Sequence, residues 1–196
     1  MRLSSPRVPP LTDQELNTDQ AEALAQLGHG PVLNIYRTIV HAPKAFTRFI
    51  AWGGYMLSRR SDLSPREREL AILRTGYRCQ SGYEWAQHVP LGRTAGLTED
   101  EIARIKLSGV EGWDVTDTAI LRATDDLHED QFIRDETWAA LAKTFTRKQM
   151  MDLVFTVAQY TQVSMILNSF GVQLDEGQEL DPDLSQLAVG PIGTEA

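Results

Sequence analysis

The chain has 196 residues, of which 42% are hydrophobic and 23% are charged, which is sufficient for one globular domain with a real core. Its 27 acidic and 19 basic residues give a formal net charge of −8, the wrong sign for a surface that neutralises nucleic-acid phosphates. No stretch reaches the roughly 18 apolar residues of a membrane-spanning helix, and the N-terminus lacks the apolar segment of a secretion signal. We therefore expect a cytoplasmic protein with neither a nucleic-acid nor a membrane partner.

Helix start signals recur along the chain. In each, a Ser or Thr is followed three residues later by Glu or Gln, so that each side chain can bond the other's free backbone N–H group. The four pairs are Thr12 with Glu15, Ser64 with Glu67, Thr98 with Glu101 and Thr146 with Gln149. Pro65 strengthens the second signal, because proline needs no hydrogen bond at the first helical position.

Between these signals, apolar residues recur at the three- and four-residue spacing of a helix, and the alternation of a strand is almost absent. The apolar residues in question are Leu70, Leu73 and Tyr77; Ile102 and Ile105; Leu121, Leu127 and Trp138; and Leu153, Phe155, Val157 and Ile166. The pattern predicts an all-α, single-domain protein of about seven or eight helices.

The two ends differ from the middle. The N-terminus is rich in proline, and the last residues are acidic with little helical spacing. We expect an N-terminal arm and first helix over 1–30, a helical domain over 31–174 and an acidic C-terminal tail over 175–196.

The run RCQSGYEWAQH, residues 78–88, holds the chain's single cysteine, a glutamate and a histidine. Helical spacing puts Ser81, Glu84 and His88 on one stripe, and Glu69 starts a stripe on the helix before it. If residues 77–80 form the turn, the two helices can pack antiparallel and bring Glu69 towards Glu84 and His88. Two carboxylates beside one imidazole favour the charged imidazolium and suit proton transfer near neutral pH.

Each of these residues also has a simpler interpretation. A Glu and a His four residues apart often form only a structural pair. Tyr83 and Trp85 are more often core or interface anchors than ligand contacts, and a lone Cys79 is most often a small buried hydrophobe. Glu84 and His88 have the spacing of two metal ligands, but the sequence supplies no further ligands, so we expect no metal site.

The segment with Glu69 followed by YEWAQH, together with DLVFTVAQYTQVSMILNSFGVQL, resembles the carboxymuconolactone decarboxylase family, which shares its fold with small alkyl hydroperoxidases. The resemblance covers about 31–174. It implies an alkyl hydroperoxidase-like helical subunit that assembles as a homotrimer or homohexamer. The hydroperoxidase branch carries a C-x2-C-x3-H motif, and its two cysteine positions fall here on Ser81 and Glu84.

The missing cysteine pair favours the decarboxylase branch, because a catalytic disulfide needs two neighbouring thiols. The resemblance then implies a lyase that removes CO2 from a small carboxylated unsaturated lactone or related acid, without a cofactor. We expect His88 to donate the proton, held by Glu69 or Glu84. The residues expected to contact the substrate are Tyr83, Trp85, Cys79, Ser81, Tyr160 and Asn168.

Arg74 and Arg78 precede the motif, but neither is placed with certainty to bind a substrate carboxylate. Two other functions stay open at this point. One is a thiol-dependent peroxidase that uses Cys79 with an external reductant, and the other is a non-catalytic oligomer that binds a small acid.

Overall fold

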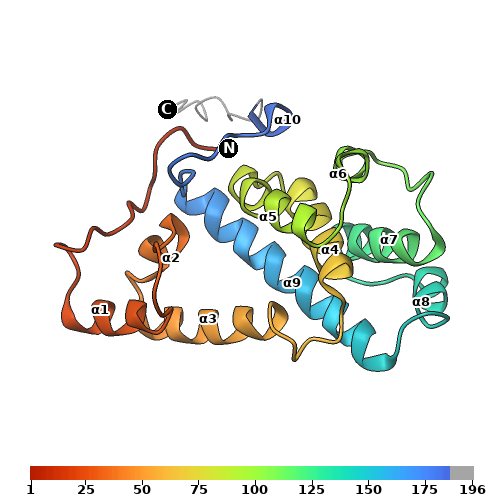
Figure 1. Ribbon diagram of the computed structural model, residues 1–196, viewed down its shortest axis with the longest axis horizontal. Helices are drawn as coiled ribbons and strands as arrows, with labels where there is room; N and C mark the ends of the chain where they lie inside the picture. The colour runs from red at the N-terminus through yellow and green to blue at the C-terminus, as the bar shows by residue number, and fades with distance from the viewer. Residues whose placement is uncertain (186–196) are drawn as a thin grey trace, which may run out of the picture.

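The structure, a computed structural model, describes residues 1–185, and within them the chain forms ten helices and no strand (Figure 1). Eight of the helices have at least seven residues, which confirms the all-α prediction. The helices are α1 (Thr18–Ala25), α2 (Asn34–Ile39), α3 (Pro43–Met56), α4 (Pro65–Arg78), α5 (Gly82–Thr94), α6 (Glu99–Ile105), α7 (Val115–Asp130), α8 (Asp135–Leu141), α9 (Arg147–Phe170) and α10 (Pro182–Ser185).

Helix α4 is the centre of the main core, because α5, α7 and α9 all pack against it (Figure 1). Four consecutive residues, Leu70 to Leu73, are therefore buried, although a helix covered on one side only would bury about every third or fourth residue. This core extends to Ile105, Leu121 and Leu153, as the spacing of apolar residues predicts. Trp138 is an exception: it lies on the short helix α8 and is 43% exposed.

A second apolar cluster lies where α1, α2 and α3 meet the C-terminal half of α9. Phe46 and Val40 are fully buried in it, and Tyr83 joins it from α5. Helix α9, drawn in blue in Figure 1, passes from the first core to the second. Helix α3 lies on one side of α9, and α4 and α5 lie on the other (Figure 1).

Three of the four expected caps begin helices. Ser64, Thr98 and Thr146 each form the reciprocal bonds with the residue three positions on, at the starts of α4, α6 and α9. The prediction for Thr12 is wrong. Its backbone N–H and hydroxyl both donate to Glu15, each over 2.8 Å, but only a turn follows. The first helix starts instead after Asn17, whose side chain and that of Gln20 form the capping box.

The residues after α9 return to the body of the protein. Lys106 pairs with Asp181 and Asp183 at 2.6 and 2.9 Å, and Leu184 is buried at the main core. Residues 186–196 of the predicted tail lie outside the described residues. Within 1–185, no helix is both long and apolar enough to cross a bilayer.

Candidate active site

The site is built at the junction of α4 and α5. The turn lies slightly later than predicted: α4 ends at Arg78, Gln80 takes the left-handed conformation with φ of 55°, and Ser81 precedes α5. The N–H of Ser81 donates to the carbonyl of Gly76 over 2.8 Å, which closes the end of α4 and turns the chain back along it.

Two glycines allow the two helices to approach closely. A Cβ atom at Gly76 would lie 3.3 Å from Cγ of Glu84, and one at Gly92 would lie 3.0 Å from a methyl group of Leu73. A larger side chain at either position would push α5 away from α4. The close packing places the start of α4, which carries Glu69, beside the middle of α5.

The structure brings Glu69, Glu84 and His88 together. Nδ1 of His88 lies 2.7 Å from Oε2 of Glu69, and Nε2 lies 3.1 Å from Oε1 of Glu84. All three residues are buried: Glu69 is 2% exposed, Glu84 is 3% exposed and His88 is 7% exposed. Tyr160 of α9 contacts the imidazole edge to face, with the ring centroids 5.0 Å apart.

The environment makes His88 a cation at neutral pH. Burial by itself lowers the pKa of His88, but the charge of Glu84 and the hydrogen bonds and charge of both carboxylates outweigh burial and raise it to about 9. Burial and the same two carboxylates raise the pKa of Tyr160 well above its usual value, so its hydroxyl keeps its proton. Arg68 adds a second positive charge, with its Nε 3.4 Å from Glu69.

Both ring nitrogens of His88 face carboxylate oxygens, so neither offers a free lone pair to a metal. Within residues 1–185, no group of three His, Cys, Asp or Glu side chains is arranged to hold a metal ion. The arrangement suits proton donation instead: the imidazolium is held by the hydrogen bond to Glu69 on one side and by the ion pair with Glu84 on the other.

A cleft of about 610 Å³ opens beside this cluster. Glu84, His88 and Tyr160 form part of one wall, and Glu69 lies behind them, outside the lining. The cleft is therefore on the Nε2 side of the imidazole. Helix α3 supplies the facing wall. Much of the cleft lining as a whole is apolar, and these residues include Leu33, Ile35, Phe49, Ile50, Leu57, Leu91 and Val163.

Two of the expected substrate contacts, Tyr83 and Tyr160, line the cleft. The other four do not. Trp85 is in the main core, with its ring 5.6 Å from that of Tyr77, because its stripe on α5 faces α4. Ser81 is fully buried at the start of α5, and Asn168 uses its amide to donate to the carbonyl of Cys79 over 3.0 Å.

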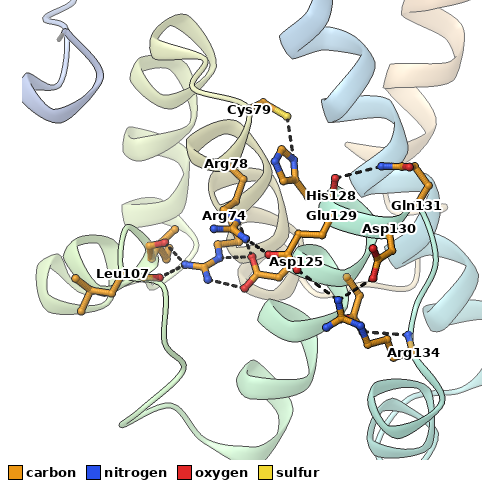
Figure 2. A network of polar contacts seen from close by, with 12 residues as sticks. Arg74, Arg78, Cys79, Leu107, Asp125, His128, Glu129, Asp130, Gln131 and Arg134 are labelled. Atoms are coloured by element: carbon orange, nitrogen blue, oxygen red, sulfur yellow. Dashed lines mark hydrogen bonds and ion pairs between the residues drawn. The ribbon is translucent and has the colours of Figure 1, made fainter. Parts of the chain in front are cut away.

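Cys79, the last of the expected substrate contacts, directly follows α4 and lies outside the cleft lining. Its sulfur lies 3.7 Å from Nδ1 of His128 on α7 (Figure 2). Burial raises the pKa of the Cys79 thiol, more than the nearby hydroxyls of Ser164 and Thr161 lower it. Burial also lowers the pKa of His128. A neutral thiol beside a neutral imidazole is a weak nucleophile.

The two arginines before the motif also point away from the cleft. Arg74 is fully buried and binds both carboxylate oxygens of Asp125, at 2.8 and 2.6 Å (Figure 2). Arg78 pairs with Asp125 and Glu129. Both arginines join α4 to α7, so their role is structural.

Several polar residues of the cleft were not expected from the sequence: Arg48 on α3, Gln87 on α5 and Gln159 on α9. Gln87 is held by Asp175, which follows α9 and accepts from the Gln87 amide over 2.6 Å and from the Tyr83 hydroxyl over 2.5 Å. Asp175 also accepts from the backbone N–H of Asn34 over 2.8 Å. No motif marks these residues, because each comes from a different part of the chain.

Comparison with known proteins agrees with this architecture. Residues 43–125 match the profile of the carboxymuconolactone decarboxylase family. A search of curated proteins finds no significant match.

Solved structures share the fold at low sequence identity. A peroxidase-related protein of Ralstonia eutropha JMP134 with the alkylhydroperoxidase AhpD core is 19% identical, with a TM-score of 0.74 over 87% of this chain and 93% of that one. A peroxidase-related protein of Silicibacter sp. TM1040 is 16% identical, with a TM-score of 0.70 over 89% and 92%. A cysteine-to-alanine variant of the debrominase Bmp8, in complex with 2,3,4-tribromopyrrole, is 12% identical, with a TM-score of 0.68 over 88% and 94%.

Proposed function

We propose that this chain, which has the alkyl hydroperoxidase-like fold and matches the carboxymuconolactone decarboxylase profile over residues 43–125, is a member of that family and a lyase that needs no cofactor. It removes CO2 from a small carboxylated unsaturated lactone or a related acid. The observation that carries this proposal is the imidazolium of His88, set between two buried carboxylates at the wall of a cleft.

The proposed reaction has two steps. The bond between the ring carbon and the departing carboxylate breaks, and its electron pair moves into the conjugated lactone as an enolate while CO2 leaves. A proton from Nε2 of His88 then forms the new C–H bond, and the enolate electrons return to that carbon. The imidazole regains its proton from solvent when the product leaves. The lactone carbonyl holds the electrons between the steps, so no external electron sink is required.

The two carboxylates have different roles in this proposal. Glu69 does not line the cleft and accepts from Nδ1, so it orients the ring and keeps the Nε2 side towards the substrate. Glu84 lines the cleft and raises the pKa of His88, so it keeps the acid protonated until the enolate forms.

The size and lining of the cleft support a small ring as the substrate. Its volume of about 610 Å³ is in the usual range for small-molecule sites, and most of its wall is apolar. The debrominase with the same fold binds 2,3,4-tribromopyrrole, a small flat ring. An apolar cleft also excludes water, which strengthens the interactions of the buried charges.

The thiol-dependent peroxidase has less support. A peroxidase of that kind needs a reactive thiolate near its acid or base, whereas Cys79 lies outside the cleft lining and its thiol pKa is raised. A catalytic disulfide within the chain is also excluded, since Cys79 is the only cysteine in the sequence.

The test is a screen of carboxylated unsaturated lactones and related acids for CO2 release, with wild-type protein and His88→Ala side by side. We expect release by the wild type and a large loss in the variant. Binding of these acids without CO2 release would support the non-catalytic alternative, and thiol-dependent peroxide consumption that depends on Cys79 would support the peroxidase.

A further inference from the structure

Helix α3 has two adjacent glycines on the wall of the cleft, Gly53 and Gly54. Glycine destabilises the interior of a helix, so two adjacent glycines within α3 need an explanation. Packing within the protein does not give one: a Cβ at Gly54 would meet no atom of residues 1–185 within 4 Å, and one at Gly53 would meet only Nε2 of Gln159, at 3.9 Å. The bare backbone leaves a flat patch on the cleft wall.

The side chain of Gln159 faces this patch from α9. Gln159 is 4% exposed, and no hydrogen bond joins its amide to another residue of the described chain. The amide is not among the fully enclosed polar groups that lack a partner, so it reaches the space of the cleft, where its N–H groups can donate to an acceptor on a bound molecule.

Besides the glycine pair and Gln159, the cleft has a positively charged side chain that can bind an acid. Arg48 lies five residues before Gly53 on α3, about one and a half turns away. Among the described residues that line the cleft, it is the only Lys or Arg. Within 1–185 it forms no ion pair. The His88 imidazolium on the facing wall is already paired with Glu84, at 3.1 Å, so Arg48 is the cation of the described lining that is left to pair with an acidic substituent.

We propose that the cleft binds a flat ring acid in one orientation. The ring lies against Gly53 and Gly54, a ring or carbonyl oxygen accepts from the amide of Gln159, and an acidic group pairs with the guanidinium of Arg48. The inference rests on the proposed function, since it assigns the substrate orientation in the same cleft.

Two probes separate charge from shape: coumalate, a flat unsaturated lactone with one carboxylate, and methyl coumalate, its uncharged ester. Binding is measured by calorimetry, without any turnover. We expect Arg48→Gln to weaken coumalate binding about fivefold to tenfold and methyl coumalate binding less than twofold. The control is Lys44→Gln, an exposed cation on the same helix outside the cleft lining, which should change neither.

Salt provides a second readout of the same pair. Added NaCl should weaken coumalate binding to the wild type more than to Arg48→Gln, because ions screen a partly exposed pair. Gln159→Leu should weaken binding of both probes, since both carry the lactone oxygens that accept from the amide.

A substitution in the glycine pair distinguishes a role in ligand binding from a role in folding alone. Gly54→Ala should raise the melting temperature, because alanine favours the helix and its methyl group meets open space. The same substitution should weaken binding of both probes at least fivefold, because the methyl group occupies the ring's position.

Three results would overturn the orientation: no coumalate binding by the wild type at 10 mM, equal effects of Arg48→Gln and Lys44→Gln, or unchanged binding in Gly54→Ala. The lyase proposal fails separately. If binding depends on Arg48 but no lactone acid releases CO2, the orientation stands and the proposed reaction does not.

Discussion

His88 is the residue on which the proposed chemistry depends, and Glu69 holds it in place. We predict that His88→Ala or Glu69→Gln lowers turnover by roughly 10² to 10⁴, the usual contribution of a general acid or base. His128→Ala is the matched control, because His128 lies on α7 beside Cys79 and outside the cleft lining. Turnover and melting temperature should be measured on the same preparations. A purely structural role would lower the melting temperature and leave turnover per folded molecule nearly intact.

The raised pKa of His88 makes the stability of the protein depend on pH. Since the folded pKa of about 9 is above the ordinary value of 6.5, the folded state holds this proton more tightly than the unfolded chain. The resulting stabilisation is complete below about pH 6.5, is lost as the pH rises through about 9, and is on the order of 3 kcal/mol.

Urea unfolding from pH 6 to pH 10 measures this effect. His88→Gln should remove most of the decrease, and the difference between the two proteins cancels the other groups that titrate in this range. The same slope in both proteins would contradict the charged imidazole. In the active enzyme, turnover should also fall above about pH 9, where the acid loses its proton.

Cys79 tests the redox alternative. Cys79→Ser should leave most of the turnover intact, because the sulfur lies outside the cleft lining and has no second thiol to pair with. Alkylation of the wild-type thiol at neutral pH should be slow, since burial raises its pKa. A loss of turnover beyond about a hundredfold, roughly 2.7 kcal/mol of transition-state stabilisation, would favour the thiol mechanism.

At the scale of the helices, the capping boxes offer a paired experiment. Thr98→Ala should lower the free energy of unfolding by about 1 kcal/mol, because it leaves the backbone N–H of Glu101, in the first turn of α6, without its acceptor. Thr12→Ala removes only a hydrogen bond that the hydroxyl donates to Glu15, where just a turn follows, so its effect should stay within about 0.5 kcal/mol. Chemical denaturation of both variants gives the comparison. Equal losses would show that the Thr12 turn stabilises the fold as much as a helix start.

The helices of the site could be predicted because their signals are local. The Ser64 cap, the stripe from Glu69 to Gly76 and the spacing of Glu84 and His88 all depend on residues close in sequence, and they place the cluster. The direction of Trp85 could not be predicted in the same way, because the side of α5 that faces α4 is set by packing. Trp85 therefore lies in the core, although Glu84 and Gln87 near it in the sequence line the cleft.

The facing wall of the cleft could not be predicted. The start of helix α3 is marked only by Pro43 at its first position, since Ala42 before it makes no side-chain bond. Arg48, Gly53 and Gly54 form no known pattern. Their common role appears only when α3 lies across from α9, about a hundred residues later in the chain. The prediction for Thr12 failed for a different reason. Thr12 and Glu15 have the spacing of a capping box, but the first helix starts after Asn17, where Asn17 and Gln20 form the capping box.

At the scale of the whole molecule, we propose the homotrimer or homohexamer that the family resemblance implies. An apolar surface fits a contact between copies: Trp52 is 43% exposed, and it stacks on Tyr55 and packs against Phe155. Leu57 and Leu91, at the cleft lining, are also exposed, by 46% and 47%. Burial of exposed apolar side chains of this kind is a common basis of stable oligomers.

Sedimentation equilibrium tests this assembly. We expect a mass of three or six times 21.9 kDa at micromolar concentration. Trp52→Glu should shift the mass towards the single chain, whereas Trp138→Glu, on α8 with the same 43% exposure, should leave it unchanged. A wild-type protein that sediments as one chain would contradict the proposal.

The bonds made by Asp175 affect when the cleft is complete during synthesis. This carboxylate holds Tyr83 and Gln87 on α5 and the first turn of α2, yet it follows the last long helix. A ribosome releases the chain from its N-terminus, so Glu69, Glu84, His88 and the helices that form the cleft emerge before Asp175 does. A nascent chain stopped at residue 172 would carry every proposed acid and base, but Tyr83 and Gln87 in the cleft wall would still lack the carboxylate that holds them.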